Sequence, residues 1–261
     1  MKHKKLIIIA GAAGEIGSEF CKQLVEQRID CIAVVRNKPM SIDSPLIQSV
    51  QCNLDNQQEI EEKFGSIDFE KYDQVVYLHT IGVDKFDPRG YPHIRPMDTI
   101  DPEVYHTNVN SFKYLMRYCV QRIRSINAGQ KDRKIAFKIS IIAGVADKHA
   151  PFVIESFCEA KFILRQYIQS SVSLYPEWIS GLSINVTSTI TKSALAVRPH
   201  ADTTYWLTPE GVVSQSMNNL LSDEMGYKEI DIIKTLPTFV EGYYENNPVL
   251  YEKWSRETGI K

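Results

Sequence analysis

The chain of 261 residues lacks several features that would assign a protein to a class at once. It has no apolar run of the length that a membrane span needs. Its formal net charge of -2 gives neither a basic face for nucleic acid nor an acidic tail. The five cysteines are odd in number and form no CxxC pair, which is typical of reduced thiols. We therefore expect a cytoplasmic protein with no nucleic-acid and no membrane partner.

The motifs of several enzyme classes are missing as well. The six histidines show no HExxH or other paired spacing, so we expect no metal site. The sequence contains no Gly-x-Ser-x-Gly and no P-loop lysine, which argues against a hydrolase or a kinase. No internal repeat, low-complexity tract or linker divides the chain. What remains is a composition with 43% hydrophobic and 24% charged residues, ordinary for a globular protein.

The most informative stretch runs from Leu6 to Gly17, with the sequence Leu-Ile-Ile-Ile-Ala-Gly-Ala-Ala-Gly-Glu-Ile-Gly. An apolar β-branched run leads into three glycines, and helical spacing of apolar residues begins at Glu15. In such a strand, glycine turn and helix, the glycines let the backbone approach a pyrophosphate. The free N–H groups at the start of the helix then face its negative charge. A tight turn without a ligand is the alternative. We expect cofactor contacts from Gly11, Ala13, Gly14, Glu15, Ile16 and Gly17.

The second predicted strand, residues 31–35, ends at Arg36. In dinucleotide-binding folds this strand end meets the adenosine ribose. An acidic residue there binds the 2′-hydroxyl, whereas a basic residue accommodates a 2′-phosphate. No acidic residue stands at this strand end, so Arg36 favours NADP(H) over NAD(H) as the cofactor. An arginine that is merely exposed at a strand end is the alternative.

Strands and helices alternate along the rest of the chain. After a first helix that ends near Arg28, the pattern predicts strands over 50–53, 74–79, 135–140, 179–185 and 230–233, and helices over 55–64, 102–126, 155–173 and 209–221. Between them, residues 84–96 hold three prolines and a glycine and should form an irregular loop. This alternation indicates an α/β fold with a doubly wound parallel sheet. We predict one Rossmann-type domain over residues 1–261.

Together these motifs resemble those of the short-chain dehydrogenase/reductase family, over nearly the whole chain. The glycine segment looks like the family's nucleotide loop in the spacing that its extended members more often use. Asn53-Leu54 stands where the family has Asp-Val beside the adenine, and His79-Thr80-Ile81-Gly82 stands where it has Asn-Asn-Ala-Gly. The resemblance implies further cofactor contacts from Asn53, Leu54, Thr80, Ile81, Gly82, Lys161, Thr189 and Thr191.

The same resemblance implies a catalytic centre. Asn108 matches the helix asparagine that holds a water, and Lys161 matches the lysine of the Tyr-x-x-x-Lys motif. Ser140 matches, with a one-residue ambiguity in register, the serine that orients the substrate oxygen. Phe157 stands where the motif has its catalytic tyrosine, and no tyrosine in the chain has a lysine four residues later. Phenylalanine has no proton to deliver, so the family's usual mechanism cannot run unchanged.

Three explanations of Phe157 are open at this point. The first is an engineered replacement of tyrosine in an NADP(H)-dependent ketoreductase or alcohol dehydrogenase. The second is a natural enzyme with another acid, and the third is a catalytically silent NADP-binding regulatory or scaffold protein. The candidate acids of the second explanation are Tyr105, His149, Glu155, Ser156 and Tyr205.

Two segments and the partners complete these expectations. Residues 191–208 have little periodicity and match the family's mobile substrate lid, and residues 239–261 form an aromatic C-terminal tail. The resemblance implies a small carbonyl or alcohol substrate. It also implies a homodimer or homotetramer built on the long helices predicted over 102–126 and 155–173.

Overall fold

The computed structural model describes residues 4–86, 100–130, 133–149, 151–234 and 243–259. The predicted loop over 84–96 therefore lies outside this description from residue 87 onward. The same is true of residues 239–242 and 260–261 of the predicted tail.

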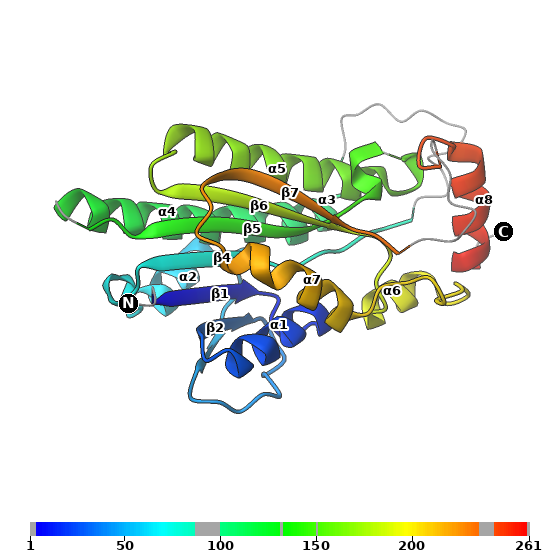
Figure 1. Cartoon of the computed structure of the whole chain (residues 1–261). Helices are drawn as coiled ribbons and strands as arrows, with labels where there is room; N and C mark the ends of the chain where they lie inside the picture. Colours follow the sequence, from blue (N-terminus) through cyan, green and yellow to red (C-terminus); the bar gives the residue numbers. More distant parts are fainter. Residues whose placement is uncertain (1–3, 87–99, 131–132, 150, 235–242, 260–261) are drawn as a thin grey trace.

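A seven-stranded parallel sheet forms the centre of the molecule (Figure 1). Its strand order is β3-β2-β1-β4-β5-β6-β7, so the order reverses between β1 and β4. The strands are β1 (Lys5–Ala10), β2 (Asp30–Val35), β3 (Ile47–Gln51), β4 (Gln74–His79), β5 (Ala136–Gly144), β6 (Ile179–Val186) and β7 (Gly226–Ile232). This doubly wound α/β architecture confirms the predicted fold class.

Helices cover both faces of the sheet, as its near-continuous apolar strands require. One layer holds α2 (Gln57–Phe64), α4 (Ser111–Gly129) and α5 (Glu155–Leu174), and the other holds α1 (Glu15–Glu26) and α7 (Pro209–Leu221) (Figure 1). Side chains alternate between the two layers along each strand. In β5, for example, Ile141 packs in the core under α4 and α5, whereas Ile142 packs in the core under α1 and α7.

Several predicted boundaries are confirmed and others are wrong. β4 and α7 begin and end where the sequence predicts, whereas β3 begins three residues before the predicted strand and β5 continues for four residues beyond Ser140. The long helix predicted from residue 102 is three pieces: α3 (Pro102–Tyr105), a π-helical turn (His106–Asn110) and α4. The predicted lid contains a short helix, α6 (Lys192–Val197), that is capped by Thr191. Hydrophobic periodicity cannot resolve such a π-turn, because it inserts a single wider turn into an otherwise helical pattern.

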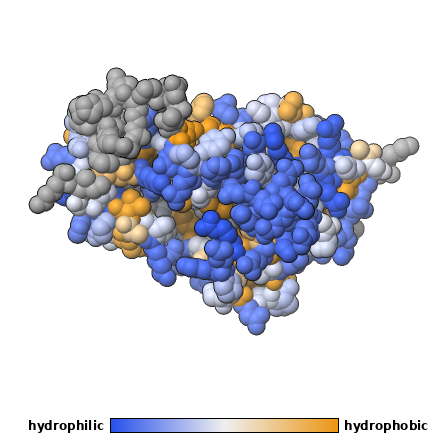
Figure 2. All heavy atoms as spheres, turned by 180° about the vertical axis from the view of Figure 1, so that it is seen from behind, coloured by the Kyte–Doolittle hydropathy of each residue, from blue (hydrophilic) through white to orange (hydrophobic). Residues whose placement is uncertain are grey.

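The C-terminal helix α8 (Asn247–Thr258) stands beyond the carboxyl ends of the strands, at the right of Figure 1. The face of the molecule that is turned away from the viewer in Figure 1 is largely hydrophilic, and hydrophobic residues reach its surface in separate patches (Figure 2). Within the described ranges, none of the helices combines the length and the apolar character needed to cross a bilayer.

Candidate nucleotide and catalytic site

The glycine turn after β1 depends on glycine at two positions. Gly11 has a φ of 83°, in the left-handed region that L side chains rarely adopt. A β-carbon on Gly17 would lie 2.4 Å from the carbonyl oxygen of Gly11 and 2.9 Å from Cα of Ala12. Gly14, which precedes α1, is exposed and carries no side-chain cap at the helix start. The turn therefore packs tightly against the helix while its outer backbone stays open to a ligand.

A cavity of about 270 Å³ lies beside this turn, at the carboxyl ends of β1, β2 and β3. It lies where the strand order reverses, the usual position of a ligand in such sheets. Seven of the predicted cofactor residues line it: Gly11, Ala13, Gly14, Arg36, Asn53, Leu54 and Ile81. An open cavity of about 430 Å³ adjoins it and shares Arg36 and Asn53 with it. The glycine turn and the predicted ribose site are thus parts of one surface.

Two acidic residues that the sequence analysis did not single out share this surface with Arg36. Asp55 lines the smaller cavity, and Glu59 and Lys63 line the adjoining one. Glu59 accepts a hydrogen bond from the backbone N–H of Asn53 at 2.9 Å. Burial raises the pKa of Asp55, against the opposing charges of His106 and Arg36. The ribose end of the site therefore carries charges of both signs.

Asp55 could have been found from the sequence. It follows Asn53-Leu54, the pair that the resemblance already places beside the adenine, and the side chain of Asn53 accepts the backbone N–H of Asp55 at 3.2 Å. Glu59 and Lys63 come from α2, one and two turns further on, so only the three-dimensional structure brings them to the end of β2.

The segment after β4 joins this cavity to the predicted catalytic residues. The Thr80 hydroxyl donates to the carbonyl oxygen of Ala10 at 2.8 Å, so it secures the glycine turn from behind. The carbonyl oxygen of Ile81 accepts a hydrogen bond from Lys161 Nζ at 3.2 Å. A β-carbon on Gly82 would lie 3.6 Å from that Nζ and 3.8 Å from Asn108 Oδ1. Three predicted site residues, Gly82, Asn108 and Lys161, thus meet at one point.

Asn108 lies within the π-helical turn and is fully buried. Its amide group donates to the carbonyl oxygens of Val83 and Val104, both at 2.9 Å, and its Oδ1 accepts the N–H of Val83 at 3.1 Å. A π-turn often marks a functional site because it redirects one side chain. Here it directs Asn108 toward the segment after β4, whose backbone the side chain holds in place.

Ser140 does not lie with these residues. Its strand neighbours Ile139 and Ile141 pack in the α4–α5 layer, so Ser140 points to the other face of the sheet, as Ile142 does. Phe157 and Lys161 belong to α5 and lie on the first face. The sequence left a one-residue ambiguity in register, and the structure resolves it: Ile141, and not Ser140, lies on the same face of the sheet as Phe157 and Lys161. The geometry therefore does not support the role predicted for Ser140. A shift of one residue reverses the face of a strand.

Phe157 is half-buried and lies between two glycines. A β-carbon on Gly82 would lie 3.8 Å from its Cε2, and one on Gly144 would lie 3.7 Å from its Cε1. The ring also packs against an apolar cluster that α8 helps to form, with Leu250 and Trp254 among its members. Lys161 Nζ lies 5.2 Å from the ring centroid. The Phe157 ring thus lies among two glycine backbones, an ammonium group and an apolar cluster.

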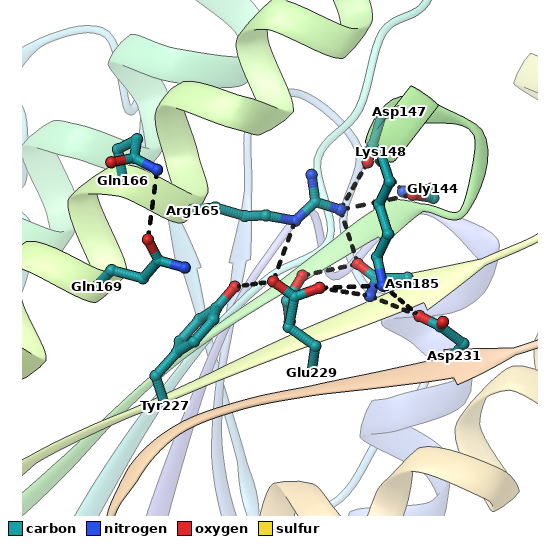
Figure 3. A network of polar contacts seen from close by, with 11 residues as sticks. Gly144, Asp147, Lys148, Arg165, Gln166, Gln169, Asn185, Tyr227, Glu229 and Asp231 are labelled. Carbon is teal, nitrogen blue, oxygen red and sulfur yellow. Dashed lines mark hydrogen bonds and ion pairs between the residues drawn. The ribbon is translucent and has the colours of Figure 1, made fainter. Parts of the chain in front are cut away.

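A buried ion pair fixes the turn that follows Gly144 (Figure 3). Arg165 Nη2 contacts Asp147 Oδ1 at 2.6 Å and Asn185 Oδ1 at 2.8 Å, and Asp147 Oδ2 accepts the backbone N–H of Gly144 at 2.7 Å. Charged groups on β7 continue the network, with Lys148 bonded to Asp231 at 2.8 Å. The network holds the backbone next to Phe157 in one position. It was not predicted, because its members are far apart in the sequence.

Lys161 is buried, with 2% of its surface exposed. Desolvation lowers its pKa from 10.5 to about 8, the Arg165 charge lowers it further, and Asp147 and Asp84 partly oppose both effects. Burial holds the pKa of His79, which faces the same region, well below its usual range. His79 is therefore a neutral residue that bonds the Tyr77 hydroxyl at 2.9 Å. Lys161 can therefore exchange its proton near neutral pH.

The remaining predicted residues have other surroundings. Glu15 accepts the backbone N–H of Lys192 at 3.1 Å, which ties the glycine turn to the lid helix α6. Thr189 bonds the carbonyl oxygen of Thr187, and Thr191 caps α6. Among the alternative acids, His149 pairs with Glu245 at 2.5 Å and stacks on Tyr244. Ser156 accepts the backbone N–H of Asp101 at 3.0 Å. None of these contacts brings a second acid to Phe157.

The predicted lid segment and the C-terminal helix α8 lie against each other beside a small cavity. A cavity of about 70 Å³ lies there, lined by Arg198, Tyr243, Tyr244 and Trp254 among others. The Arg198 guanidinium lies between the rings of Trp206 and Trp254, 4.3 and 4.4 Å from their centroids. It also pairs with Glu257 at 3.4 Å. These contacts hold the segment after α6 against α8.

Comparison with known protein families gives a match to the first third of the chain. Residues 7–87 match the model of the NAD dependent epimerase/dehydratase family, which covers the glycine turn and the first four strands. No curated protein sequence matches the chain.

Solved structures match almost the whole chain at low sequence identity. A short chain dehydrogenase from Burkholderia cenocepacia in complex with NADP is 13% identical with a TM-score of 0.69, over 97% of this chain and 98% of that one. A 4-hydroxyisoleucine dehydrogenase complexed with NADH is 21% identical with a TM-score of 0.63, over 87% and 97%. A tyrosine-to-phenylalanine variant of ElxO with NADPH bound is 13% identical with a TM-score of 0.67, also over 87% and 97%. The chain therefore has the fold of these dinucleotide-binding dehydrogenases, and its first third matches the epimerase/dehydratase family model.

Proposed function

We propose that the chain is an NADP(H)-dependent oxidoreductase that interconverts a carbonyl and an alcohol in the cytoplasm. One observation carries this proposal: the glycine-lined cavity leads through Ile81 to the point where Lys161 and Asn108 meet. A dinucleotide is long enough to need both regions, whereas a mononucleotide would occupy the first alone. The five cysteines are free and buried, which suits a reducing compartment.

The residues of the cavity suit a dinucleotide phosphate. The open backbone at Ala13 and Gly14 would hold the pyrophosphate, and Arg36 would pair with the 2′-phosphate, with Lys63 beside it. Asp55 and Glu59 oppose this preference, although Glu59 is already engaged by the Asn53 backbone. A bound nicotinamide supplies hydride to a carbonyl carbon. Lys161 would hold its ribose, next to the carbonyl oxygen of Ile81.

We further propose that Phe157 is the natural residue and that this enzyme uses a different proton donor. A single engineered change would remove the tyrosine hydroxyl and leave the serine in place. Here the residue of β5 on the shared face is Ile141, and Phe157 is packed into an apolar cluster. The ElxO variant, which has a phenylalanine in place of a tyrosine and has NADPH bound, supports the related point that such a substitution in this fold is compatible with cofactor binding.

A second candidate is a catalytically silent NADP-binding regulatory or scaffold protein. The side chains at two positions favour it, because neither Ile141 nor Phe157 offers a hydroxyl to a substrate oxygen. Such a protein would bind the cofactor with the same residues and turn over no carbonyl compound.

Phe157→Tyr separates these functions. We expect the natural form to oxidise NADPH in the presence of a carbonyl substrate and the tyrosine variant to change its turnover by less than about tenfold. If the tyrosine alone confers activity, a gain of roughly 10²–10⁴-fold is expected from a positioned general acid, and Phe157 is then the lesion of an inactivated enzyme. Cofactor binding without turnover in both forms would support the silent protein instead. NADPH consumption by both forms, with NADPH titration alongside, measures all three outcomes.

We also propose that the chain forms a homodimer or homotetramer through α4 and α5. Two large apolar residues of α5, Phe162 and Leu174, are 59% and 70% exposed and would be covered in such an interface. Sedimentation at micromolar concentration tests this, and a single species near 29.8 kDa would contradict it.

A further inference from the structure

The proposed reduction needs a proton donor, and the structure has a buried ammonium group, that of Lys161, next to Ile81 and Gly82. We propose that Lys161 itself delivers the proton to the substrate oxygen, in place of the missing tyrosine. This assignment rests on the proposed oxidoreductase function. It makes Lys161 a catalytic residue in addition to a ribose ligand.

The first argument is the incomplete hydrogen bonding of Lys161. Its ammonium has three N–H groups, and among the residues that the structure describes it has one acceptor, the carbonyl oxygen of Ile81 at 3.2 Å. No carboxylate of the described residues lies within ion-pair distance of its Nζ. Lys138 is the informative contrast, because it is equally buried yet bonds Asn219 O, Ser222 O and Ser222 Oγ at 2.5–3.0 Å. Lys138 therefore has a protein acceptor for each of its N–H groups, whereas Lys161 retains N–H groups that can donate to a ligand.

The second argument is where those donors lie. Gly82 is exposed, and the space that a β-carbon would occupy there lies 3.6 Å from Lys161 Nζ. Phe157 Cε2 and Asn108 Oδ1 bound the same space at 3.8 Å. The tip of a buried lysine therefore meets an exposed backbone position, Gly82, which has no side chain of its own to cover it. A small polar atom entering over Gly82 would come within reach of the ammonium group and stay in contact with the Phe157 ring.

The third argument is the charge around the ammonium. The groups that face it are His79 on β4, Asp84 after β4, Asp147 in the turn after β5 and Arg165 one turn along α5. His79 is neutral, Asp147 is paired with Arg165, and the two carboxylates only partly offset the desolvation of Lys161. The pKa of Lys161 is thereby lowered to about 8. The ammonium is the main form at neutral pH and is a stronger acid than an ordinary lysine.

The proton transfer balances without another reagent. The hydride would come from a bound reduced nicotinamide, which would lose that C–H electron pair and so be oxidised. When the hydride adds to the carbonyl carbon, the π pair of the C=O bond moves to the oxygen. That oxygen forms its O–H bond with a proton from Nζ, whose N–H electron pair stays on nitrogen. Lys161 becomes a neutral amine and regains a proton from solvent water. In the oxidation of an alcohol, the neutral amine accepts the same proton.

The test compares Lys161→Arg and Lys161→Met with the control Lys138→Met. NADPH oxidation is followed with benzaldehyde, cyclohexanone, pyruvate and phenanthrenequinone as probes, over pH 6–10. We expect kcat/KM of the natural protein to fall above about pH 8, where Lys161 loses its proton. The arginine variant keeps the positive charge, but guanidinium does not release its proton in this range, and rates are compared at NADPH concentrations that saturate each form. Its rate should fall roughly 100-fold, the lower end for loss of a general acid, and the alkaline decline should vanish. Lys138→Met should keep the natural rate and pH profile.

A measurement without substrate tests the titration of the same group. Because the pKa of Lys161 is about 8 when folded and 10.5 when unfolded, the unfolded chain binds more protons between these values, and stability rises with pH across that window. The urea midpoint should rise less steeply with pH in Lys161→Met than in the natural protein.

Four results would overturn the assignment. They are an alkaline decline that persists in Lys161→Arg, an unchanged rate in Lys161→Met, an unchanged slope of the urea midpoint, and silence of every form. In the last case, Phe157→Tyr that also stays silent with NADPH bound refutes the proposed function itself. Activity restored only by that tyrosine refutes Lys161 as the donor and leaves the oxidoreductase in place.

Discussion

The two halves of the sheet differ in how closely they match the site that the sequence resemblance predicts. The half formed by β1 to β4 keeps the glycine turn, the cavity beside it and a basic residue at the end of β2. The half formed by β5 to β7, with the helix α5 that packs on it, carries Lys161, but it has an isoleucine and a phenylalanine where the resemblance predicts hydroxyls, and it holds a buried ion-pair network. Holding a dinucleotide depends on backbone shape and charge spread over many residues. Delivering a proton depends on one or two atoms, so this half can change its chemistry by a few substitutions without loss of the fold.

The largest predicted effect concerns the ion-pair network of the second half. Asp147→Asn leaves the Arg165 charge without its closest carboxylate in a buried site. Breaking a buried pair in this way costs about 3–5 kcal/mol of unfolding free energy. Glu62→Gln, which breaks an exposed pair of α2 in the first half, should leave the midpoint almost unchanged. Urea unfolding of both variants measures the difference, and equal midpoints would show that the network does not stabilise the second half.

The next effect concerns the glycine turn of the first half. Gly17→Ala places a β-carbon against the carbonyl oxygen of Gly11, so the turn must shift. We expect a loss of about 1–3 kcal/mol in stability from this overpacking. NADPH binding should weaken at the same time, because the shifted backbone no longer approaches the phosphates. Gly129→Ala is the matched control, since nothing lies within 4 Å of a β-carbon there and alanine favours a helix. Full NADPH affinity in Gly17→Ala would refute this account of the turn.

The fold was predictable to the extent that local pattern determines it. Apolar runs of β-branched residues identify β1, β2 and β4, because these strands are buried on both faces. The partly exposed edge strands β3 and β7 have mixed patterns, and their predicted starts were wrong by three and four residues. The break of the helix at Asn108 left no trace in the periodicity of its apolar residues.

The site was predictable where adjacent residues form it. The glycine turn and Arg36 are read from a single strand–turn–helix unit and the strand that follows it, and they line one cavity. Ser140 was misplaced because a strand alternates every residue, so an ambiguity of one position changes the face. Asp147, Arg165 and Asn185 come from three elements, and only folding brings their side chains together.

The smallest effect is also the most direct test of the central claim, that the first half is an intact site for NADP(H). Equilibrium titration of the natural protein and Arg36→Ala with NADPH and with NADH, at one fixed salt concentration, measures it. We predict saturable binding of both cofactors by the natural protein, with NADPH bound about tenfold more tightly. This corresponds to roughly 1.5 kcal/mol for one charge-assisted contact at an exposed site. In Arg36→Ala the two affinities should become similar through a loss for NADPH alone. No saturable binding of either cofactor would contradict the site, and an unchanged preference in Arg36→Ala would contradict the role of Arg36.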